Sequence, residues 1–177
     1  MALLKVPITQ HDHVLGNPQS RVTLVEYGDY QCPHCAAAQP FLKQIEARYD
    51  DDLCFVFRHF PLTEVHPLAE TAAEIAEFAG SQGVFWPMHE AIFANQPDLG
   101  LPLLIWLATK LKLPSVGLRD ALAAHIFAQK VRADFIGGVR SGVNGTPTVF
   151  INGVRHDSPY GVLSLAGAIE GAIRAAA

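Results

Sequence analysis

The spacing of apolar residues changes between two periods along the chain, and the order of the changes predicts a sheet covered by helices. The β-branched, almost continuously apolar run 22–27 is typical of a strand buried on both faces. A helical period follows from about residue 33 to Tyr49. Residues 53–60 then alternate like a second strand, which Pro61 ends. The chain therefore begins with strand, helix and strand.

The middle of the chain has a helical period throughout. We expect helices from residue 67 to about 79 and at about 84–94, 101–112, 115–124 and 127–141. Strand signals return at 148–151, Asn152-Gly153 predicts a hairpin turn into 154–156, and a last helix is expected at about 160–174. Residues 11–21 are polar and rich in turn formers, so we expect them to lie over the surface. This order indicates a layered sheet interrupted by a helical insertion.

Composition narrows the classes of function. Of 177 residues, 50% are hydrophobic and 17% charged, which predicts one compact domain or one domain with an insertion. The formal net charge of −4 supplies no basic surface for a phosphate backbone, so we expect no nucleic-acid partner. The longest apolar run, 101–108, falls far short of the roughly 20 residues that a membrane span needs. We therefore expect no membrane insertion.

The cysteines and the N-terminus bear on the compartment. Three cysteines are too few for a scaffold built on disulfides. Lys5 and Pro7 interrupt the N-terminal residues before the apolar segment of a secretion signal could form. We expect a cytoplasmic protein, or a periplasmic one if a signal was removed.

The motif Cys32-Pro33-His34-Cys35 stands where the first strand runs into the first helix. A disulfide limits the Cα separation to about 4.4–6.8 Å, and the spacing i, i+3 within one helical turn satisfies that limit. At the helix start, unpaired N–H groups and the positive dipole end stabilise a thiolate. We predict that Cys32 is the exposed nucleophile, with a pKa of about 3.5–7.5 against about 8.5 for a free cysteine. Cys35, one turn deeper, then resolves the mixed disulfide.

The neighbours within the motif support this assignment, and two other interpretations stay open. As an imidazolium or N–H donor, His34 would favour the thiolate further, and Pro33 fits the first helical position because its missing N–H is not needed there. The cysteine pair could instead form half of a zinc site, although no second such pair supplies the remaining ligands. It could also be two inert core thiols. Cys54 is interpreted as a buried small hydrophobic residue.

Two segments carry a family resemblance. Residues 25–35 read Val-Glu-Tyr-Gly-Asp-Tyr-Gln-Cys-Pro-His-Cys, and residues 145–153 read Gly-Thr-Pro-Thr-Val-Phe-Ile-Asn-Gly. With the helical insertion between them, they resemble the DsbA-like branch of the thioredoxin superfamily, and they are similar to the thioredoxin-like C-terminal domains of some sodium/proton antiporters. The resemblance implies an α/β thioredoxin fold with an inserted all-helical domain. Its expected parts are an N-terminal leader at 1–18, a thioredoxin-like core at 19–62 and 139–177, and the insertion at 63–138.

The resemblance also gives roles to three further residues. It implies a cis peptide bond before Pro147, facing the cysteines, with the Thr146 backbone placed to pair with an extended substrate. The alternative is an ordinary trans proline that opens a strand. It also implies that Glu26 is a buried acid that helps to move the proton of the resolving thiol. The phase of Glu26 with Val22 and Leu24 supports burial, which would raise its pKa and make it a base near neutrality. A solvated surface glutamate is the alternative.

The remaining polar and aromatic residues have simpler expected roles. We expect large apolar residues of the insertion to form its core, namely Phe85, Trp86, Met88, Ile92, Phe93 and Trp106. We expect four histidines to be surface or satisfied polar residues, namely His59, His66, His89 and His125. Glu70, Glu74 and Glu77 are interpreted as a solvated helix face.

The leading hypothesis is a thiol:disulfide oxidoreductase that exchanges a Cys32–Cys35 disulfide with cysteine-containing protein or small-molecule substrates. It would work with a redox recycling partner and need no metal or organic cofactor. A second hypothesis is a redox-sensing regulatory or binding module related to the antiporter-linked domains. The third is a metal-binding domain that uses Cys32, Cys35 and histidines.

Overall fold

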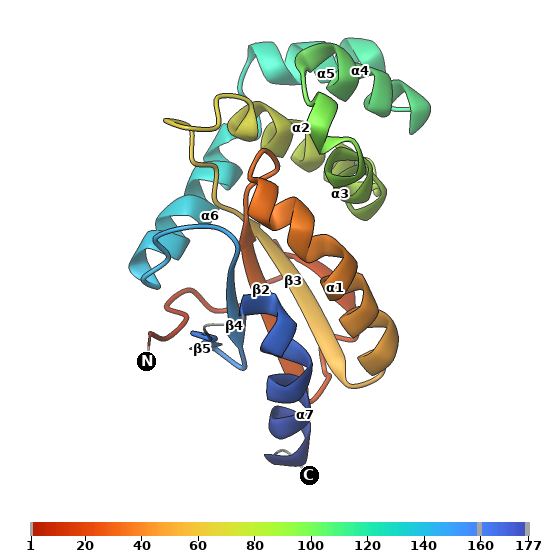
Figure 1. Ribbon diagram of the computed structural model, residues 1–177. Coiled ribbons are helices and arrows are strands. Elements are labelled where there is room, and N and C mark those ends of the chain that lie inside the picture. Colours follow the sequence, from red (N-terminus) through yellow and green to blue (C-terminus); the bar gives the residue numbers. More distant parts are fainter. Residues whose placement is uncertain (1, 159–160, 176–177) are drawn as a thin grey trace.

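A five-stranded mixed sheet forms the centre of the protein in a computed structural model that describes residues 2–158 and 161–175 (Figure 1). The strand order is β1-β3-β2-β4-β5. The central strands β2 and β3 run parallel, and the other neighbouring pairs are antiparallel. The strands are β1 (His13–Gly16), β2 (Val22–Gly28), β3 (Leu53–His59), β4 (Thr148–Ile151) and β5 (Val154–Arg155).

The described residues also form seven α-helices. They are α1 (Pro33–Tyr49), α2 (Ala69–Ser81), α3 (Phe85–Ala94), α4 (Leu101–Lys110), α5 (Ser115–Ala123), α6 (Ala128–Arg140) and α7 (Leu165–Ala175). Short 3-10 turns stand at Gln96–Asp98 and Gly161–Ser164. Helices α2 to α6 all lie between β3 and β4 in the chain, so the predicted helical insertion is present. Each strand and helix predicted from residue 22 onward is confirmed, although residue 160, in the last one, lies outside the described residues.

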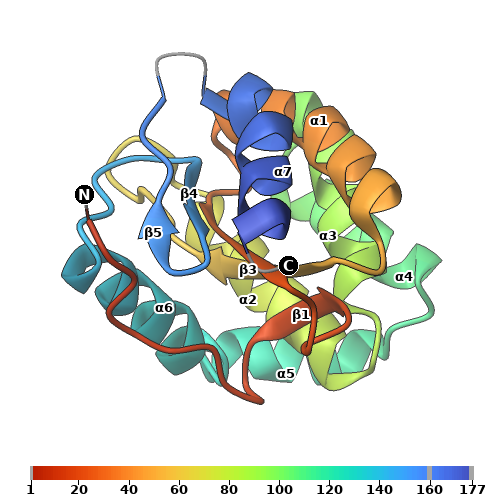
Figure 2. The ribbon, with the colours of Figure 1, turned by 90° about the horizontal axis from the view of Figure 1, so that it is seen from below.

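The two faces of the sheet are covered by different helices. Helices α1 and α7 lie on one face and α6 on the other (Figures 1 and 2). Because side chains alternate along β2, Val22 and Leu24 join the core under α1, whereas Val25 and Tyr27 join the core under α6. Helix α6 approaches closely at Gly138, where an added Cβ would lie 2.7 Å from the ring of Phe60.

The predicted hairpin turn is confirmed. Asn152 and Gly153 have φ angles of 46° and 77°, as a two-residue hairpin with both central residues in the left-handed region requires. The Asn152 side chain also accepts a 2.7 Å hydrogen bond from the backbone N–H of Thr23. The turn is thereby tied to the neighbouring strand β2.

Residues 11–21 lie at the surface, as expected, and none of them is buried, but they contain a strand that was not predicted. Residues 13–16 form the edge strand β1, which pairs antiparallel with β3 from His13 opposite Phe57 to Gly16 opposite Cys54. So short a segment shows no clear period by itself. It becomes a strand because β3 offers it an unpaired edge.

The acidic residues of α2 are also not a solvated face. Glu70 is exposed, but Glu74 and Glu77 are only 4% and 6% exposed. Helix α2 is enclosed by the other helices of the insertion and by the end of the sheet, so its polar positions need partners inside the protein. Histidines supply them: His125 lies 3.2 Å from Glu74, and His59 lies 2.8 Å from Glu77.

The other expectations for single residues had mixed outcomes. His59 and His89 are buried and hydrogen-bonded, so they are satisfied polar residues and not surface ones. Trp106 was expected in the core but is 51% exposed, with Lys110 over its ring. The core role is confirmed for Phe85, Met88, Ile92 and Phe93, with Trp86 partly buried against them. Cys54 is buried, as predicted.

Within the described part of the chain, no helix combines the length and the apolar character needed to cross a bilayer.

Candidate active site

The two cysteines of the motif stand at the start of α1, on the turn that follows β2. Cys32 has an extended backbone conformation, and Pro33 and the two residues after it begin the helix. The carboxylate of Asp29 shapes this turn by accepting hydrogen bonds from the backbone N–H groups of Gln31 at 2.7 Å and Cys32 at 3.2 Å. All three cysteines of the chain are free thiols in this structure.

Cys32 is the acidic thiol of the pair. Its pKa falls from an ordinary value of 9.0 to about 5 because Cys35 donates a hydrogen bond to its sulfur, which outweighs the opposing effect of burial. The Thr146 side chain and the backbone N–H groups of Cys35 and His34 lower the pKa further. The Thr146 hydroxyl is buried and has no hydrogen-bond partner among the described residues while Cys32 is a thiol, so it is available to donate to the thiolate.

Cys32 is less accessible than predicted. The residue is only 3% exposed, because the backbone carbonyl of Thr146 lies 3.4 Å from its sulfur. The Thr146–Pro147 peptide bond is cis. The segment before β4 therefore covers the first sulfur directly, although more than a hundred residues separate the two in the chain.

Cys35 has the opposite environment. It is fully buried, and burial raises the pKa of its thiol far above the ordinary range, helped by the hydrogen bond to Cys32 and by Glu26. The backbone N–H of Asp29 donates to its sulfur at 3.5 Å. One thiol of the pair thus ionises easily, and the other holds its proton.

Glu26 lies on the same face of β2 as Leu24, beneath α1. Its side chain is completely buried, and neither carboxylate oxygen has a hydrogen-bond partner among the described residues. Burial raises the pKa of Glu26 from 4.5 to about 8, and repulsion from Glu46 and Cys32 adds to the shift, while Gln39 opposes it. The charge of Glu26 in turn raises the pKa of Cys35, so these two groups are coupled.

A groove of about 580 Å³ runs beside the motif. Helix α1, the segment from Thr146 into β4, and the residues after β5 form its walls. The lining includes three members of the predicted site and several apolar side chains, namely His34, Thr146 and Pro147 with Phe41, Val149 and Leu163. His34 is exposed, and the contact that it makes with the Cys32 sulfur comes from its backbone N–H rather than from its imidazole.

Sequence reasoning missed two residues that build the site. The carboxylate of Asp29 also binds the segment that follows β3. Its second oxygen accepts a hydrogen bond from the backbone N–H of Leu62 at 2.8 Å and lies 2.8 Å from His66. Its place three residues before Cys32 is a signal that could have found it, because aspartate favours such turns. Gln96, from the insertion, donates to the backbone carbonyls of Tyr30 and Cys32, each at 2.8 Å. No local pattern marks it.

The chain is similar to known proteins over nearly its whole length. A family model described as thioredoxin matches residues 9–171. The chain is 41% identical over 170 residues to a Na(+)/H(+) antiporter, NhaA 1, from Salinispora arenicola; the match covers 96% of this chain and 26% of that protein. The chain therefore spans about a quarter of the length of the curated relatives that it matches.

Solved structures agree with the fold. BdbD from Bacillus subtilis, in its oxidised form, superposes with a TM-score of 0.86 at 26% identity, covering 98% of each chain. Alpha-DsbA1 from Wolbachia pipientis superposes with a TM-score of 0.84 at 22% identity, covering 98% of this chain and 96% of that one. The predicted fold class, α/β with a helical insertion as in DsbA-like proteins, is confirmed.

Proposed function

The chain belongs to the thioredoxin family, and from that premise we propose that it is a thiol:disulfide oxidoreductase that exchanges a Cys32–Cys35 disulfide with cysteines of protein substrates. One observation carries the proposal: a thiol with a pKa of about 5 stands at a helix start, hydrogen-bonded to a buried thiol of raised pKa. A nucleophile and a resolving group need this asymmetry.

The exchange proceeds in two balanced steps. In the reducing direction the Cys32 thiolate attacks a substrate disulfide, which forms a mixed disulfide and releases one substrate thiolate. Cys35 then loses its proton and attacks the Cys32 sulfur, which closes the Cys32–Cys35 disulfide and releases the second substrate thiolate. The oxidising direction is the reverse. Only thiols and disulfides exchange electrons, so the reaction needs no organic cofactor, but a redox partner must return the pair to its starting state.

Glu26 is the proton acceptor for Cys35 in this proposal. A carboxyl group with a pKa of about 8 is partly ionised near neutral pH, so it can take the proton and release it again. Its electrostatic coupling to Cys35 supports the role. Glu26→Gln should slow resolution of the mixed disulfide while leaving the first attack by Cys32 intact, which single-turnover kinetics would separate.

Thr146 and Pro147 position the substrate. The Thr146 carbonyl lies against the Cys32 sulfur, so an extended substrate that pairs with this backbone would take over the contact and open the sulfur to attack. The groove beside it offers apolar surface, including Phe41, for the flanking substrate residues. Pro33 and His34 start the helix whose N–H groups stabilise the thiolate.

The low pKa of Cys32 also bears on whether the protein oxidises or reduces its substrates. Stabilising the thiolate stabilises the reduced form of the pair, which makes its disulfide the stronger oxidant. A cytoplasmic compartment stays a prediction, and there a reducing role would be favoured. The reduction potential of the Cys32–Cys35 pair decides between oxidant and reductant.

Substitution of the cysteines tests the function. Cys32→Ser should abolish both insulin reduction and oxidation of a cysteine-containing peptide, whereas Cys54→Ala, which removes a buried thiol in β3, should retain both. Equal activity of Cys32→Ser and the unmodified protein would refute the proposal.

A redox-sensing module is the second candidate, and the relatives named as antiporters favour it. In that case the oxidation state of the pair would control binding to a membrane-transport partner. The candidate predicts that such a partner binds the oxidised and reduced forms with different affinities. Equal binding of both forms would exclude it.

A further inference from the structure

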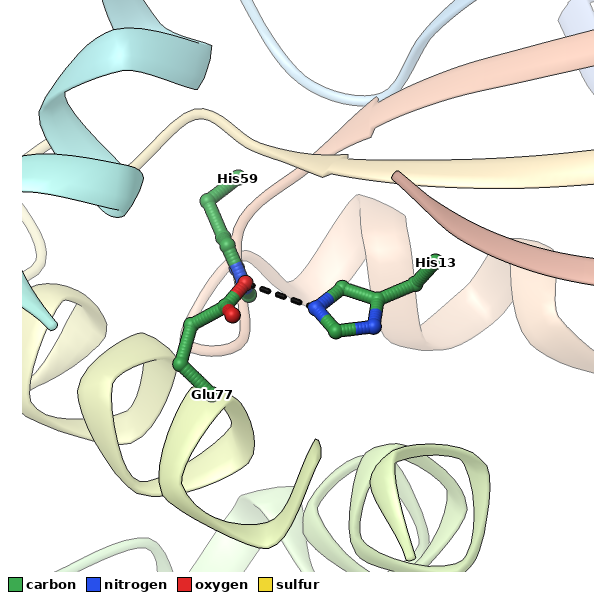
Figure 3. Close-up of side chains that lie close together, drawn as sticks. All are labelled: His13, His59 and Glu77. Carbon is green, nitrogen blue, oxygen red and sulfur yellow. Dashed lines mark hydrogen bonds and ion pairs between the residues drawn. The ribbon is translucent and has the colours of Figure 1, made fainter. Parts of the chain in front are cut away.

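A second group of reactive side chains lies where the edge of the sheet meets the helical insertion. His13 comes from β1, His59 from the end of β3 and Glu77 from α2 (Figure 3). Both imidazole Nε2 atoms lie 2.8 Å from the same carboxylate oxygen, Glu77 Oε1. One ligand atom from each residue falls within 4.8 Å of the other two. We call these three residues the His-His-Glu cluster.

The cluster is buried and held in place from several sides. The side chains of His13, His59 and Glu77 are 16%, 1% and 8% exposed. The His13 ring stacks on Phe85 with a centroid separation of 3.4 Å. Burial alone would raise the pKa of Glu77, but hydrogen bonds and attraction from the two histidines hold it well below the ordinary range. Glu77 is therefore a carboxylate that its surroundings keep ionised.

The charges around the cluster leave it able to accept a cation. Lys130 lies 3.9 Å from Glu77 Oε1, but it is also bound to Asp134 at 2.6 Å. Imidazoles that bind a metal are neutral, so in the metal-bound state the carboxylates of Glu77 and Asp134 would exceed Lys130 by one negative charge. A buried site with surplus negative charge and two imidazole nitrogens favours a positive ion.

We propose that His13, His59 and Glu77 bind a divalent transition-metal ion of the zinc class, with water as the fourth ligand. Two imidazoles, one carboxylate and water form a recognised tetrahedral zinc ligand set. Zinc bonds of about 2.0–2.2 Å require ligand atoms roughly 3.3 Å apart, so the Nε2–Oε1 distances of 2.8 Å must open by about half an ångström. Both distances end on Glu77 Oε1, so a small rotation of the Glu77 side chain would open both at once.

Binding would exchange hydrogen bonds for metal bonds. Each Nε2 must give up its hydrogen, so each imidazole binds either as the Nδ1–H tautomer or after losing a proton. Because the ligands come from β1, β3 and α2, the ion would fasten the edge strand and the insertion to the central sheet.

The test must separate this cluster from the cysteine pair, which can also bind zinc. The chain of 177 residues is first oxidised so that Cys32 and Cys35 are linked, and is then titrated with Zn²⁺ by calorimetry and with Co²⁺ by visible spectroscopy. We expect one ion per chain and a Co²⁺ spectrum without the charge-transfer band of a thiolate ligand. Zn²⁺ should also raise the melting temperature.

Matched variants complete the test. Glu77→Gln keeps the shape of the side chain, and His13→Ala removes the most exposed ligand; each should weaken Zn²⁺ binding by at least about 100-fold, more than loss of an outer partner costs. His11→Ala, two residues away and exposed, should bind as the unmodified protein does. His13→Ala keeps the test valid if Glu77→Gln does not fold.

Three outcomes would overturn the proposal. They are no binding to the oxidised protein, equal binding by His13→Ala and the unmodified protein, and binding that occurs only in the reduced form and disappears in Cys35→Ser. The last would assign the ion to the cysteine pair. Because the proposal does not depend on thiol exchange, failure of the insulin assay leaves it standing.

Discussion

The buried carboxyl group of Glu26 should make the protein less stable as the pH rises, and Glu26→Gln should remove that effect. In the folded state the pKa of Glu26 is raised by burial to about 8, against an ordinary value of 4.5 that applies when the chain is unfolded. Between these values the folded state holds a proton that the unfolded state has released. The stabilising contribution of the protonated group is therefore complete below about pH 4.5 and is lost progressively up to about pH 8.

The size of the effect follows from the pKa shift. Each pKa unit corresponds to about 1.4 kcal/mol, so the total loss is roughly 5 kcal/mol. Between pH 5 and pH 7 the contribution changes by about 2.5 kcal/mol. This is slightly less than the full amount for two pH units, because the carboxyl group of the unfolded chain is not yet fully ionised at pH 5. Glutamine has nearly the same shape and no ionisation. Over this range the free energy of unfolding of Glu26→Gln should thus rise by about 2.5 kcal/mol relative to the unmodified protein.

Urea unfolding at pH 5, 6 and 7 measures this difference. The proteins are compared in the oxidised form, so that titration of Cys32 does not overlap with that of Glu26. Glu64→Gln, at an exposed position, is the matched control and should follow the unmodified protein at every pH. If the difference between Glu26→Gln and the unmodified protein were the same at pH 5 and pH 7, Glu26 would not carry a raised pKa and its proposed role as a base would fail.

Three further predictions test the site and the packing. Thiolate absorbance of the reduced protein should appear with a midpoint near pH 5 and vanish in Cys32→Ser; a midpoint near 9 would contradict the assigned acidity. Gly138→Ala should cost about 1–3 kcal/mol in urea unfolding, since the new methyl group meets Phe60, whereas Gly171→Ala, with open space around it, should not destabilise the protein. Asp12→Asn should cost about 3–5 kcal/mol by leaving Arg58 buried without its carboxylate, and a loss below 1 kcal/mol would show that the pair is not needed.

The local part of the fold could be predicted because it depends on residues close together in the chain. The apolar run at 22–27 and the helical period that follows decide where β2 and α1 form. The Asn152-Gly153 pair decides the hairpin, because both residues tolerate a positive φ. In the same way, the i, i+3 spacing of Cys32 and Cys35 already places two sulfurs on one helical turn.

The predictions that failed concern residues whose environment comes from distant segments. The four residues 13–16 became β1 because the edge of β3 was free to pair with them. Glu77 reads as a surface residue of α2, but His13 and His59 arrive from two strands to bind it. Gln96 reaches the backbone of Cys32 from the insertion with no sequence signal.

The sequence by itself thus determined the order of strands and helices from residue 22 onward and which cysteine stands at the helix start, because periodicity, turn chemistry and a helix start act over a few residues. Only the tertiary structure decided which groups surround them. Burial of Glu26 and Cys35, the Thr146 carbonyl over Cys32 and the meeting of the His-His-Glu cluster all require segments far apart in the chain to pack together. Packing sets the local exclusion of water and the nearest charges, and these fix which thiol ionises and which carboxyl group keeps its proton.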